Sequence, residues 1–227
     1  MSRQAGKFEY WQQIETIFLD MDGTLLDLYF DNHFWLQHVP EVYAQKHQLS
    51  DEQANEELMQ RYQAARGSLD WYCIDYWSEQ LDLDIRQLKR ELAHRIALRP
   101  NVTEFLQAIN TIDKRVVMVT NAHPATVEIK LEQTGIDVHF DRIIDSHAIG
   151  LAKEQAGFWQ QLQSAESYDR DSTMLIDDNL EVLQSAADYG IAHLFGIRLP
   201  DSQKDHVDAT PFVVIDDFAE FISGIDP

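Results

Sequence analysis

A short apolar run that ends in two carboxylates constrains the fold of this chain more than any other feature. Residues 17–27 read IFLDMDGTLLD, and the first three side chains are typical of a buried strand. Asp20 and Asp22 would then lie where the chain leaves the sheet, and open α/β sheets place their active sites at that end of their strands. A turn is the ordinary alternative, because Asp, Gly and Thr often follow a strand.

The spacing of Asp20 and Asp22 is not explained by a turn alone. Side chains two residues apart on an extended segment point to the same side, so the two carboxylates would share one small volume. Charges of the same sign at that distance repel each other and raise the pKa of one of the pair. A divalent cation, or a proton held by one carboxyl, would remove the conflict.

The second half of the chain alternates between strand-like and helix-like segments. Such alternation is typical of a parallel sheet whose strands are joined by crossover helices. It predicts an α/β fold with further strands at residues 115–120, 141–146, 172–177, 192–197 and 211–216.

A block of about 70 residues with helical periodicity separates the first strand from the others. It predicts helices at 31–47, 51–66, 70–81 and 84–98, several of which open on an Asp suited to the N-cap. The block interrupts the sheet in sequence. We therefore expect a core formed by residues 1–27 and 98–227 and a helical cap formed by residues 28–97.

Polar residues also follow other strands of the predicted sheet. Thr120 and Asn121 follow one strand, Lys153 precedes a helix, and a second strand ends in Asp177 and Asp178. Because parallel strands end at the same edge, these groups would converge on the first two carboxylates. Taken singly, each has an ordinary explanation as a strand end, a solvated lysine or a helix N-cap. Their joint presence predicts a functional site.

Composition limits the partners of such a site. With 44% hydrophobic and 11% aromatic residues, the chain is globular in composition and long enough for one sizeable core. The formal charge of -21 argues against nucleic-acid binding, which needs a basic surface. An anionic substrate would be repelled at long range, so a phosphate site would need local positive charge from a metal ion, a lysine or backbone N–H groups.

The cysteine content and the apolar runs of the sequence indicate in which cellular compartment the protein is expected. Cys73 is the only cysteine, which excludes an intrachain disulfide and fits a reducing compartment. No cluster of Cys and His is evident, so hard oxygen ligands favour Mg²⁺ over zinc. Neither a signal peptide nor an apolar run of ~20 residues is present, and we expect a cytoplasmic protein with no membrane span. The sequence carries no indication of oligomeric state.

The residues at the strand ends resemble the motifs of the haloacid dehalogenase-like (HAD) phosphohydrolases. LDMDGTLLD is similar to the first motif, VVMVTN to the second, Lys153 to the third and LIDDN to the fourth. The resemblance implies a Rossmann-like three-layer sandwich with a central parallel sheet and a helical cap of the C1 type. It also implies hydrolysis of a small phosphate ester.

The resemblance assigns catalytic roles to the acidic residues. Asp20 would be the nucleophile that forms an aspartyl-phosphate, and Asp22 would be the general acid and base. Mg²⁺ would be held by Asp20, Asp178 and the backbone carbonyl of Asp22, with Asp177 as an additional or indirect ligand. Lys153 would keep the nucleophile ionised.

Substrate binding is expected to involve four residues. Thr120, backbone N–H groups near Asn121 and the Lys153 ammonium would contact the phosphoryl oxygens. Thr24 would help to place the side chain of Asp22.

Two cap stretches, FDNHFW and DWYCIDYW, resemble the branch of the superfamily that hydrolyses purine 5′-monophosphates such as GMP and IMP. Their aromatic side chains would stack on a purine. The candidates for contacts beyond the phosphate are Phe30, Asp31, Asn32, Trp71 and Tyr72. The alternative is that aromatic residues at helical spacing form the cap's own core, which would leave a phosphatase of broad specificity.

Three other functions share parts of the pattern. A haloalkanoate dehalogenase uses the same nucleophile without a metal, but it needs neither Asp22 nor paired carboxylates in the last motif. A sugar-phosphate phosphatase or phosphomutase of the same superfamily would use all of these groups. A non-catalytic binding protein of this fold is disfavoured, because every group needed for turnover is present.

Overall fold

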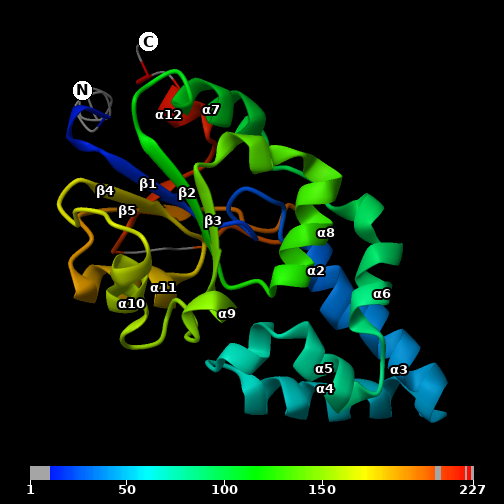
Figure 1. Ribbon diagram of the computed structural model, residues 1–227. Coiled ribbons are helices and arrows are strands. Elements are labelled where there is room, and N and C mark those ends of the chain that lie inside the picture. The colour runs from blue at the N-terminus through cyan, green and yellow to red at the C-terminus, as the bar shows by residue number, and fades with distance from the viewer. Residues whose placement is uncertain (1–10, 208–210, 223, 226–227) are drawn as a thin grey trace.

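The fold is built on a six-stranded parallel sheet (Figure 1). The computed structural model describes residues 11–207, 211–222 and 224–225. Residues 1–10, on which the expectation about a signal peptide rests, lie outside the described part. In spatial order the strands are β3 (Arg142–Asp145), β2 (Arg115–Thr120), β1 (Thr16–Leu19), β4 (Thr173–Ile176), β5 (His193–Ile197) and β6 (Val213–Ile215).

Helices connect these strands and cover both faces of the sheet. They are α7 (Val102–Ile109), α8 (Pro124–Thr134), α9 (Ser146–Ile149), α10 (Phe158–Ala165), α11 (Leu180–Tyr189) and α12 (Ala219–Ile222), with a 3₁₀ turn at Ile136–His139. Figure 1 shows α7 and α12 on one side of the sheet and α10 and α11 on the other.

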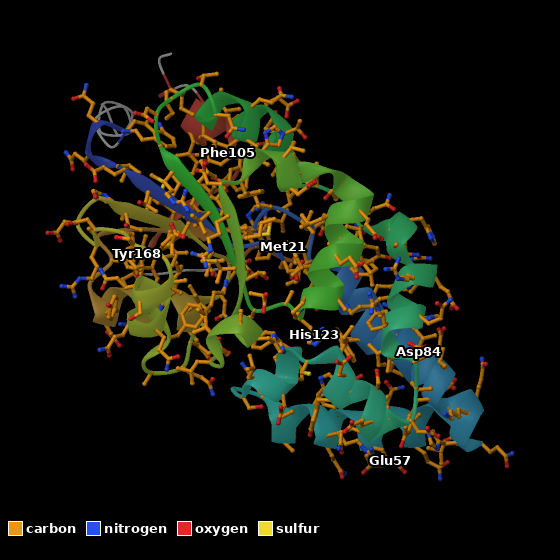
Figure 2. The ribbon with its side chains drawn as sticks, viewed as in Figure 1. Met21, Glu57, Asp84, Phe105, His123 and Tyr168 are labelled. Carbon is orange, nitrogen blue, oxygen red and sulfur yellow. The ribbon has the colours of Figure 1, made fainter. Side chains whose placement is uncertain are left out.

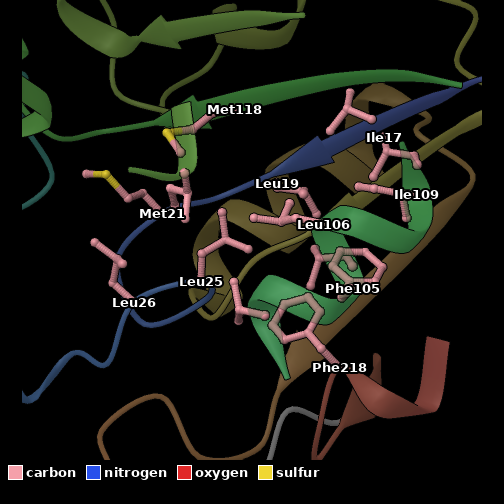
Figure 3. Close-up of a cluster of buried hydrophobic side chains, with 14 of the residues drawn as sticks. Ile17, Leu19, Met21, Leu25, Leu26, Phe105, Leu106, Ile109, Met118 and Phe218 are labelled. Atoms are coloured by element: carbon pink, nitrogen blue, oxygen red, sulfur yellow. The ribbon is translucent and has the colours of Figure 1, made fainter. Parts of the chain in front are cut away.

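The sheet separates two buried clusters, because successive side chains of a strand point to opposite faces. Ile17 and Leu19 of β1 belong to the same cluster as Phe105 of α7, which Figure 3 shows. Phe18, between them in sequence, belongs to the other cluster with Phe158 of α10. The molecule is therefore an α/β three-layer sandwich, as predicted.

Strand order places β1 at the centre, between β2 and β4. The strand positions predicted from the sequence are confirmed, although several observed strands are slightly shorter. Because β1, β2 and β4 are parallel neighbours, the residues that follow them emerge at one edge of the sheet.

Between β1 and α7 the chain is helical. The elements are α2 (Tyr29–His33), a π-helical turn (Phe34–His38), α3 (Val39–His47), α4 (Asp51–Ala65), a 3₁₀ turn (Leu69–Tyr72), α5 (Ile74–Leu81), α6 (Ile85–Glu91) and a 3₁₀ turn (Ala93–Arg95). We call residues 28–97 the cap segment and the rest the core segment, which is the division that we propose from the sequence. None of the described helices combines the length and apolar character needed to cross a bilayer.

The predicted N-caps of the cap helices are right in one case. Asp84 caps α6 by accepting a hydrogen bond from the backbone N–H of Gln87 at 2.9 Å. The first helix begins at Tyr29 rather than Asp31, and α4 is capped by Ser50, the residue before the expected Asp. Ser50 forms a reciprocal capping box with the third residue of the helix, which leaves that Asp inside the first turn.

Two predicted cap helices are too long. The predicted helix 70–81 is interrupted at Cys73, whose backbone is extended with ψ of 109°. The predicted helix 84–98 ends at Glu91. Leu98, which was predicted to end this helix, instead pairs with Leu26 in an antiparallel bridge. This bridge returns the chain to the core segment.

The cap segment has a buried cluster of its own. Its members include Phe34, Tyr43, Leu58 and Trp77. Trp77 is 1% exposed and meets the ring of Tyr62 edge-on at 5.1 Å. The alternative expectation, in which cap aromatics form the core of the cap, is therefore confirmed for Trp77.

Candidate active site

The carboxyl ends of β1, β2 and β4 bring together the residues that the sequence singled out. Asp20 follows β1, Thr120 ends β2 and Asp177 follows β4. The backbone of Asp20 remains tied to β4, because its N–H donates to the carbonyl of Ile176 at 3.0 Å. Lys153 reaches the same edge from the loop after α9.

Lys153 is the buried cation at the centre of this group. Its ammonium donates to Asp20 Oδ1 and to Asp177 Oδ2, at 2.6 Å each, and to the carbonyl of Val119 at 3.1 Å. Burial opposes the charge of Lys153, but the two carboxylates outweigh it and raise the pKa of the ammonium. Burial also raises the pKa of Asp20 to about 6, although Lys153 acts in the opposite direction.

A carboxylate cluster formed by Asp20, Asp177 and Asp178 meets the requirements of a hard divalent cation. One oxygen from each residue lies within 4.8 Å of the others. Oδ2 of Asp20 is buried and has no hydrogen-bond partner within the described part of the chain. Burial, and then the carboxylates of Asp20 and Asp177, raise the pKa of Asp178. This oxygen-only donor set with unbalanced negative charge fits Mg²⁺.

The two carboxylates after β4 differ in how many partners they have. Both oxygens of Asp177 are engaged, one by Lys153 and the other by the N–H of Asn179 at 2.9 Å. The Asp178 carboxylate accepts no hydrogen bond from the described residues, so it is the one available to a metal ion. The chain passes close to it at Gly23, where φ is +83° and an added methyl group would overlap the Asp178 carboxylate.

A chain of alternating charges extends from Asp22 into the cap segment. Lys130 of α8 donates to Asp22 Oδ1 at 2.5 Å and to Asp31 Oδ2 at 2.6 Å. Lys89 of α6 donates to Asp31 Oδ1 at 2.9 Å, and its ammonium lies 4.4 Å from the ring centre of Phe34. Both lysines are at most 2% exposed. The four charges link the acid–base candidate of the core segment to the first helix of the cap segment.

Burial and these ion pairs together shift the pKa values of the four groups. Burial raises the pKa of Asp22 to about 6, more than Lys130 lowers it. For Asp31, the ammonium groups of Lys130 and Lys89 outweigh burial and lower the pKa to about 2. Burial lowers the pKa of Lys89, whereas for Lys130 the two carboxylates outweigh burial and raise the pKa. Asp22 can therefore exchange a proton near neutral pH, while Asp31 stays ionised.

Thr120 and Asn121 line the cavity described below, but their side chains already have partners. The hydroxyl of Thr120 accepts a hydrogen bond from a backbone N–H two residues later, at 3.1 Å. The Asn121 amide accepts from the N–H of Lys153 and donates to Glu154, both at 2.9 Å. Glu154 also accepts from the Tyr72 hydroxyl of the cap segment at 2.8 Å. These contacts fix the loop that carries Lys153.

Thr24 does not make the contact with Asp22 that the sequence led us to expect. The residue is fully buried and does not line the cavity. Its hydroxyl has no hydrogen-bond partner in the described residues. The contact expected between Thr24 and Asp22 is made by Lys130 instead, since a lysine from α8 can reach the carboxylate and also balance its charge.

A cavity of about 360 Å³ is lined by both segments. This volume lies within the range of small-molecule sites. Asp20, Asp22 and Asp178 line it from the core segment, and Asp31 and Asn32 line it from the cap segment. Its aromatic wall consists of Trp35, Tyr62, Trp71, Tyr72 and Trp77. Phe30, expected to contact substrate, belongs instead to the buried cluster of the core.

The fold also brings together side chains that the sequence did not associate. Ligand atoms of Cys73, His123 and His147 lie within 4.8 Å of one another. The expectation that the chain has no Cys/His cluster is therefore wrong. The three residues come from segments that are remote in sequence, so their spacing gave no signal.

The sequence analysis missed Lys130, Lys89 and Glu154. Lysines on helices are mostly solvated, and a lysine is rarely fully buried unless it is paired. A signal existed for Lys130, because it lies three residues after Val127 and four after Thr126, on the face of α8 that is buried. No comparable signal marked Glu154, which is held by partners on two other segments.

A parallel sheet with a carboxylate cluster and a buried lysine at its edge, under a helical cap, defines a hydrolase of the HAD type. The chain belongs to the haloacid dehalogenase-like hydrolase family, whose model matches residues 14–190. It is similar to the GMP/IMP nucleotidase YrfG of Escherichia coli (strain K12), with 42% identity over 192 residues that cover 85% of this chain and 86% of the relative.

Two further proteins are similar to this chain, one in sequence and one in structure. The pyrimidine 5′-nucleotidase YjjG of Escherichia coli (strain K12) is 26% identical over 179 residues, which cover 73% of this chain and 77% of the relative. The crystal structure of a HAD phosphatase from Thermococcus onnurineus matches with a TM-score of 0.74 and 19% identity, covering 92% of this chain and 97% of that one. At this identity the structural match shows the fold alone.

Proposed function

We propose that this enzyme hydrolyses purine nucleoside 5′-monophosphates, with GMP and IMP among its substrates, and that it uses Mg²⁺. The observation that carries the proposal is the ion pair of Asp20 and Lys153 beside a carboxylate cluster, in a cavity with an aromatic wall. The identity of 42% to a protein named GMP/IMP nucleotidase supports the choice of substrate. A cytoplasmic location is part of the proposal, and the single cysteine supports it.

Asp20 acts as the nucleophile in this mechanism. Its carboxylate attacks phosphorus in line, the ester oxygen leaves, and an aspartyl-phosphate forms that water then hydrolyses. Lys153 fixes Oδ1 of Asp20, and among the described residues Oδ2 has no hydrogen-bond partner. Mg²⁺ held by Asp20, Asp178 and the backbone carbonyl of Asp22 would supply positive charge to the phosphoryl oxygens and to the nucleophile.

Asp22 acts as the general acid and then as the general base. It protonates the leaving oxygen and later takes a proton from the attacking water, and a pKa of about 6 suits both steps near neutral pH. Lys130 holds one of its oxygens at 2.5 Å, so the carboxyl group keeps one orientation.

Buried lysines reduce the repulsion between an anionic substrate and a chain of charge -21. Lys153 and Lys89 line the cavity, and Lys130 contacts two carboxylates that do. All three are at most 2% exposed, so their fields are less screened than those of surface charges. Each of them is paired with carboxylates, so a bound Mg²⁺ would still be needed to supply the rest of the local positive charge.

The aromatic wall supports a flat substrate. Trp35, Tyr62 and Trp71 line the cavity together, and stacking of a base on an aromatic side chain is worth ~1 to 3 kcal/mol in nucleic-acid-binding proteins. Asn32 adds an amide oxygen that suits the edge of a purine, while its amide nitrogen donates to Asp201 at 2.6 Å. Discrimination between phosphate esters would thus come from the cap segment, since the groups around Asp20 contact the phosphoryl group only.

A substrate panel tests the proposal. We expect kcat/KM for GMP and IMP to exceed that for pyrimidine nucleotides and sugar phosphates by at least about tenfold, which corresponds to ~1.4 kcal/mol of extra binding. Trp71→Leu should lower kcat/KM for GMP and leave that for p-nitrophenyl phosphate, which carries no base, nearly unchanged. Equal kcat/KM across the panel would reject the nucleotidase and leave the phosphatase. An isomer instead of free phosphate would indicate a mutase.

A further inference from the structure

Cys73, His123 and His147 form a second cluster of metal-binding side chains, where the cap segment meets the core segment. Cys73 directly precedes α5 of the cap, His123 directly precedes α8, and His147 lies in α9. Figure 2 shows His123 where the core faces the cap helices. One ligand atom of each residue lies within 4.8 Å of the others. None of the three lines the cavity of the candidate active site.

His147 has unsatisfied polar atoms within this cluster. Both of its ring nitrogens are buried, and neither has a hydrogen-bond partner in the part of the chain that the structure describes. A buried imidazole without a partner is destabilising, and a bound cation would offset that cost.

Asp75 can supply a fourth ligand. Its carboxylate lies 3.5 Å from Nε2 of His123, and its side chain is 76% exposed and therefore free to move. Nδ1 of His123 accepts a hydrogen bond from the N–H of Ala125 at 3.3 Å. A metal ion at Nε2 would move the ring proton to Nδ1 and displace that bond. The start of α8 would keep its hydrogen bonds to the backbone carbonyl of His123.

The environment of Cys73 suits a metal-bound thiolate. Its sulfur accepts a hydrogen bond from the N–H of Tyr76 at 3.4 Å, and the N-terminus of α5 favours negative charge. One thiolate, two imidazoles and one carboxylate are the ligands of a tetrahedral Zn²⁺ site, whereas Mg²⁺ takes oxygen ligands. Ligand atoms in such a site are roughly 3.4 to 3.6 Å apart, so the cluster would contract by at most about 1.4 Å on binding.

We propose that Cys73, His123 and His147, completed by Asp75, bind Zn²⁺, and that the bound ion cross-links the cap segment to the core segment. Two of the four ligands come from each segment. Tyr72, next to Cys73, lines the catalytic cavity, so the ion restrains the two walls of that cavity relative to each other. The expected consequence is slower turnover, reversed by a chelator that removes Zn²⁺.

Cobalt(II) tests the site directly, because a thiolate bound to Co²⁺ gives a charge-transfer absorption band in the near ultraviolet. Cys73 is the only cysteine, so the band can come from no other residue. The full-length protein is titrated with Co²⁺ under reducing conditions, with Mg²⁺ in excess to fill the carboxylate cluster. We expect the band to saturate at one equivalent and Zn²⁺ to remove it by displacement. A protein without this band at one equivalent would overturn the proposal.

Variants show whether the histidines take part. His147→Gln should weaken the affinity for Co²⁺ and Zn²⁺ by more than about 100-fold, since loss of a ligand exceeds the usual effect of losing an outer partner. Cys73→Ser should abolish the band. His94→Gln is the matched control, because His94 is exposed and lies outside the cluster. Near-ultraviolet circular dichroism checks that each variant is folded. If His147→Gln bound Co²⁺ and Zn²⁺ with wild-type affinity, His147 would not be a ligand. That result would contradict the proposed site.

Activity then tests the cross-link. One equivalent of Zn²⁺ should slow hydrolysis of p-nitrophenyl phosphate by the wild type and leave Cys73→Ser at its basal rate. Equal inhibition of both proteins would place Zn²⁺ at the carboxylate cluster and refute the cross-link. The cobalt titration needs no catalysis, so a failure of the proposed function leaves it valid.

Discussion

Replacement of Asp31 by Asn removes the anion that lies between two buried cations. Lys89 and Lys130 contact Asp31 at 2.9 and 2.6 Å, and both are at most 2% exposed. Loss of one partner from a buried ion pair costs about 3 to 5 kcal/mol, because the remaining charge is left without compensation. In a domain of this size, that destabilisation corresponds to a fall in Tm of roughly 6 to 20 °C.

The same substitution should change how stability depends on pH. The pKa of the Asp31 carboxyl is about 2 in the folded protein, compared with 3.8 for an unperturbed Asp in the unfolded chain. The ion pair therefore stabilises the fold above about pH 4, and this stabilisation is lost as the pH falls toward 2. The full contribution is about 2 kcal/mol, of which about 1 kcal/mol is lost by pH 3. Asp31→Asn has no carboxylate at this position, so acidification cannot remove this contribution from the variant. The difference in unfolding free energy between wild type and variant should therefore shrink from pH 6 to pH 3.

Urea unfolding followed by circular dichroism measures both effects. Asp82→Asn is the matched control, since Asp82 also pairs with a lysine but its side chain is 81% exposed. We expect Asp82→Asn to leave Tm nearly unchanged. The reasoning would be refuted if Asp31→Asn were no less stable than Asp82→Asn, or if its deficit were the same at pH 6 and pH 3.

Three further predictions concern catalysis. Asp20→Asn should reduce phosphate release by at least about 10³-fold with an unchanged circular dichroism spectrum, because an amide is a poor nucleophile. Chelation should remove activity and Mg²⁺ restore it, and calorimetry should show weaker Mg²⁺ binding in Asp178→Asn than in Asp177→Asn, since Lys153 and Asn179 already occupy the Asp177 oxygens. Asp22→Asn should slow alkyl phosphate hydrolysis more than hydrolysis of activated aryl phosphates, whose leaving groups need little protonation.

Each of these predictions has a result that contradicts it. Near-normal turnover by Asp20→Asn would remove it as the nucleophile. A chelator-resistant enzyme would exclude the Mg²⁺ mechanism, and equal Mg²⁺ affinities of the two variants would reject Asp178 as the preferred ligand. Equal losses on both ester types would reject Asp22 as the general acid.

The sheet and its functional edge could be predicted from the sequence, because both follow from local pattern. The run from Ile17 to Leu19 and its later counterparts mark buried strands, and parallel pairing alone brings Asp20 and Asp177 to one edge. The ends of the cap helices could not be predicted in the same way. The extended residue Cys73 and the bridge of Leu98 to Leu26 depend on contacts with distant residues, which helical periodicity does not report.

The same limit explains what was missed in the site. Lys153 was found because it stands in a recognisable position between two strands. Lys130 and Lys89 lie on ordinary helices, and their burial depends on the approach of Asp31 from a third helix. Thr24 shows the converse, since its place next to the acidic pair in sequence suggested a role that a lysine from a distant helix fills.

The central position of β1 determines when the molecule can be completed during synthesis. Its partners are β2 and β4, so the strand near the start of the chain has both neighbours only after Ile176 has been made. The buried members of the cap cluster all lie between Phe34 and Ile85, so the cap forms from local contacts. On the ribosome we therefore expect the cap to fold before β1 has both of its partners. Asp20 lies early in the chain, whereas Lys153, Asp177 and Asp178 are made much later, so an unfinished chain that lacks them cannot assemble the carboxylate cluster.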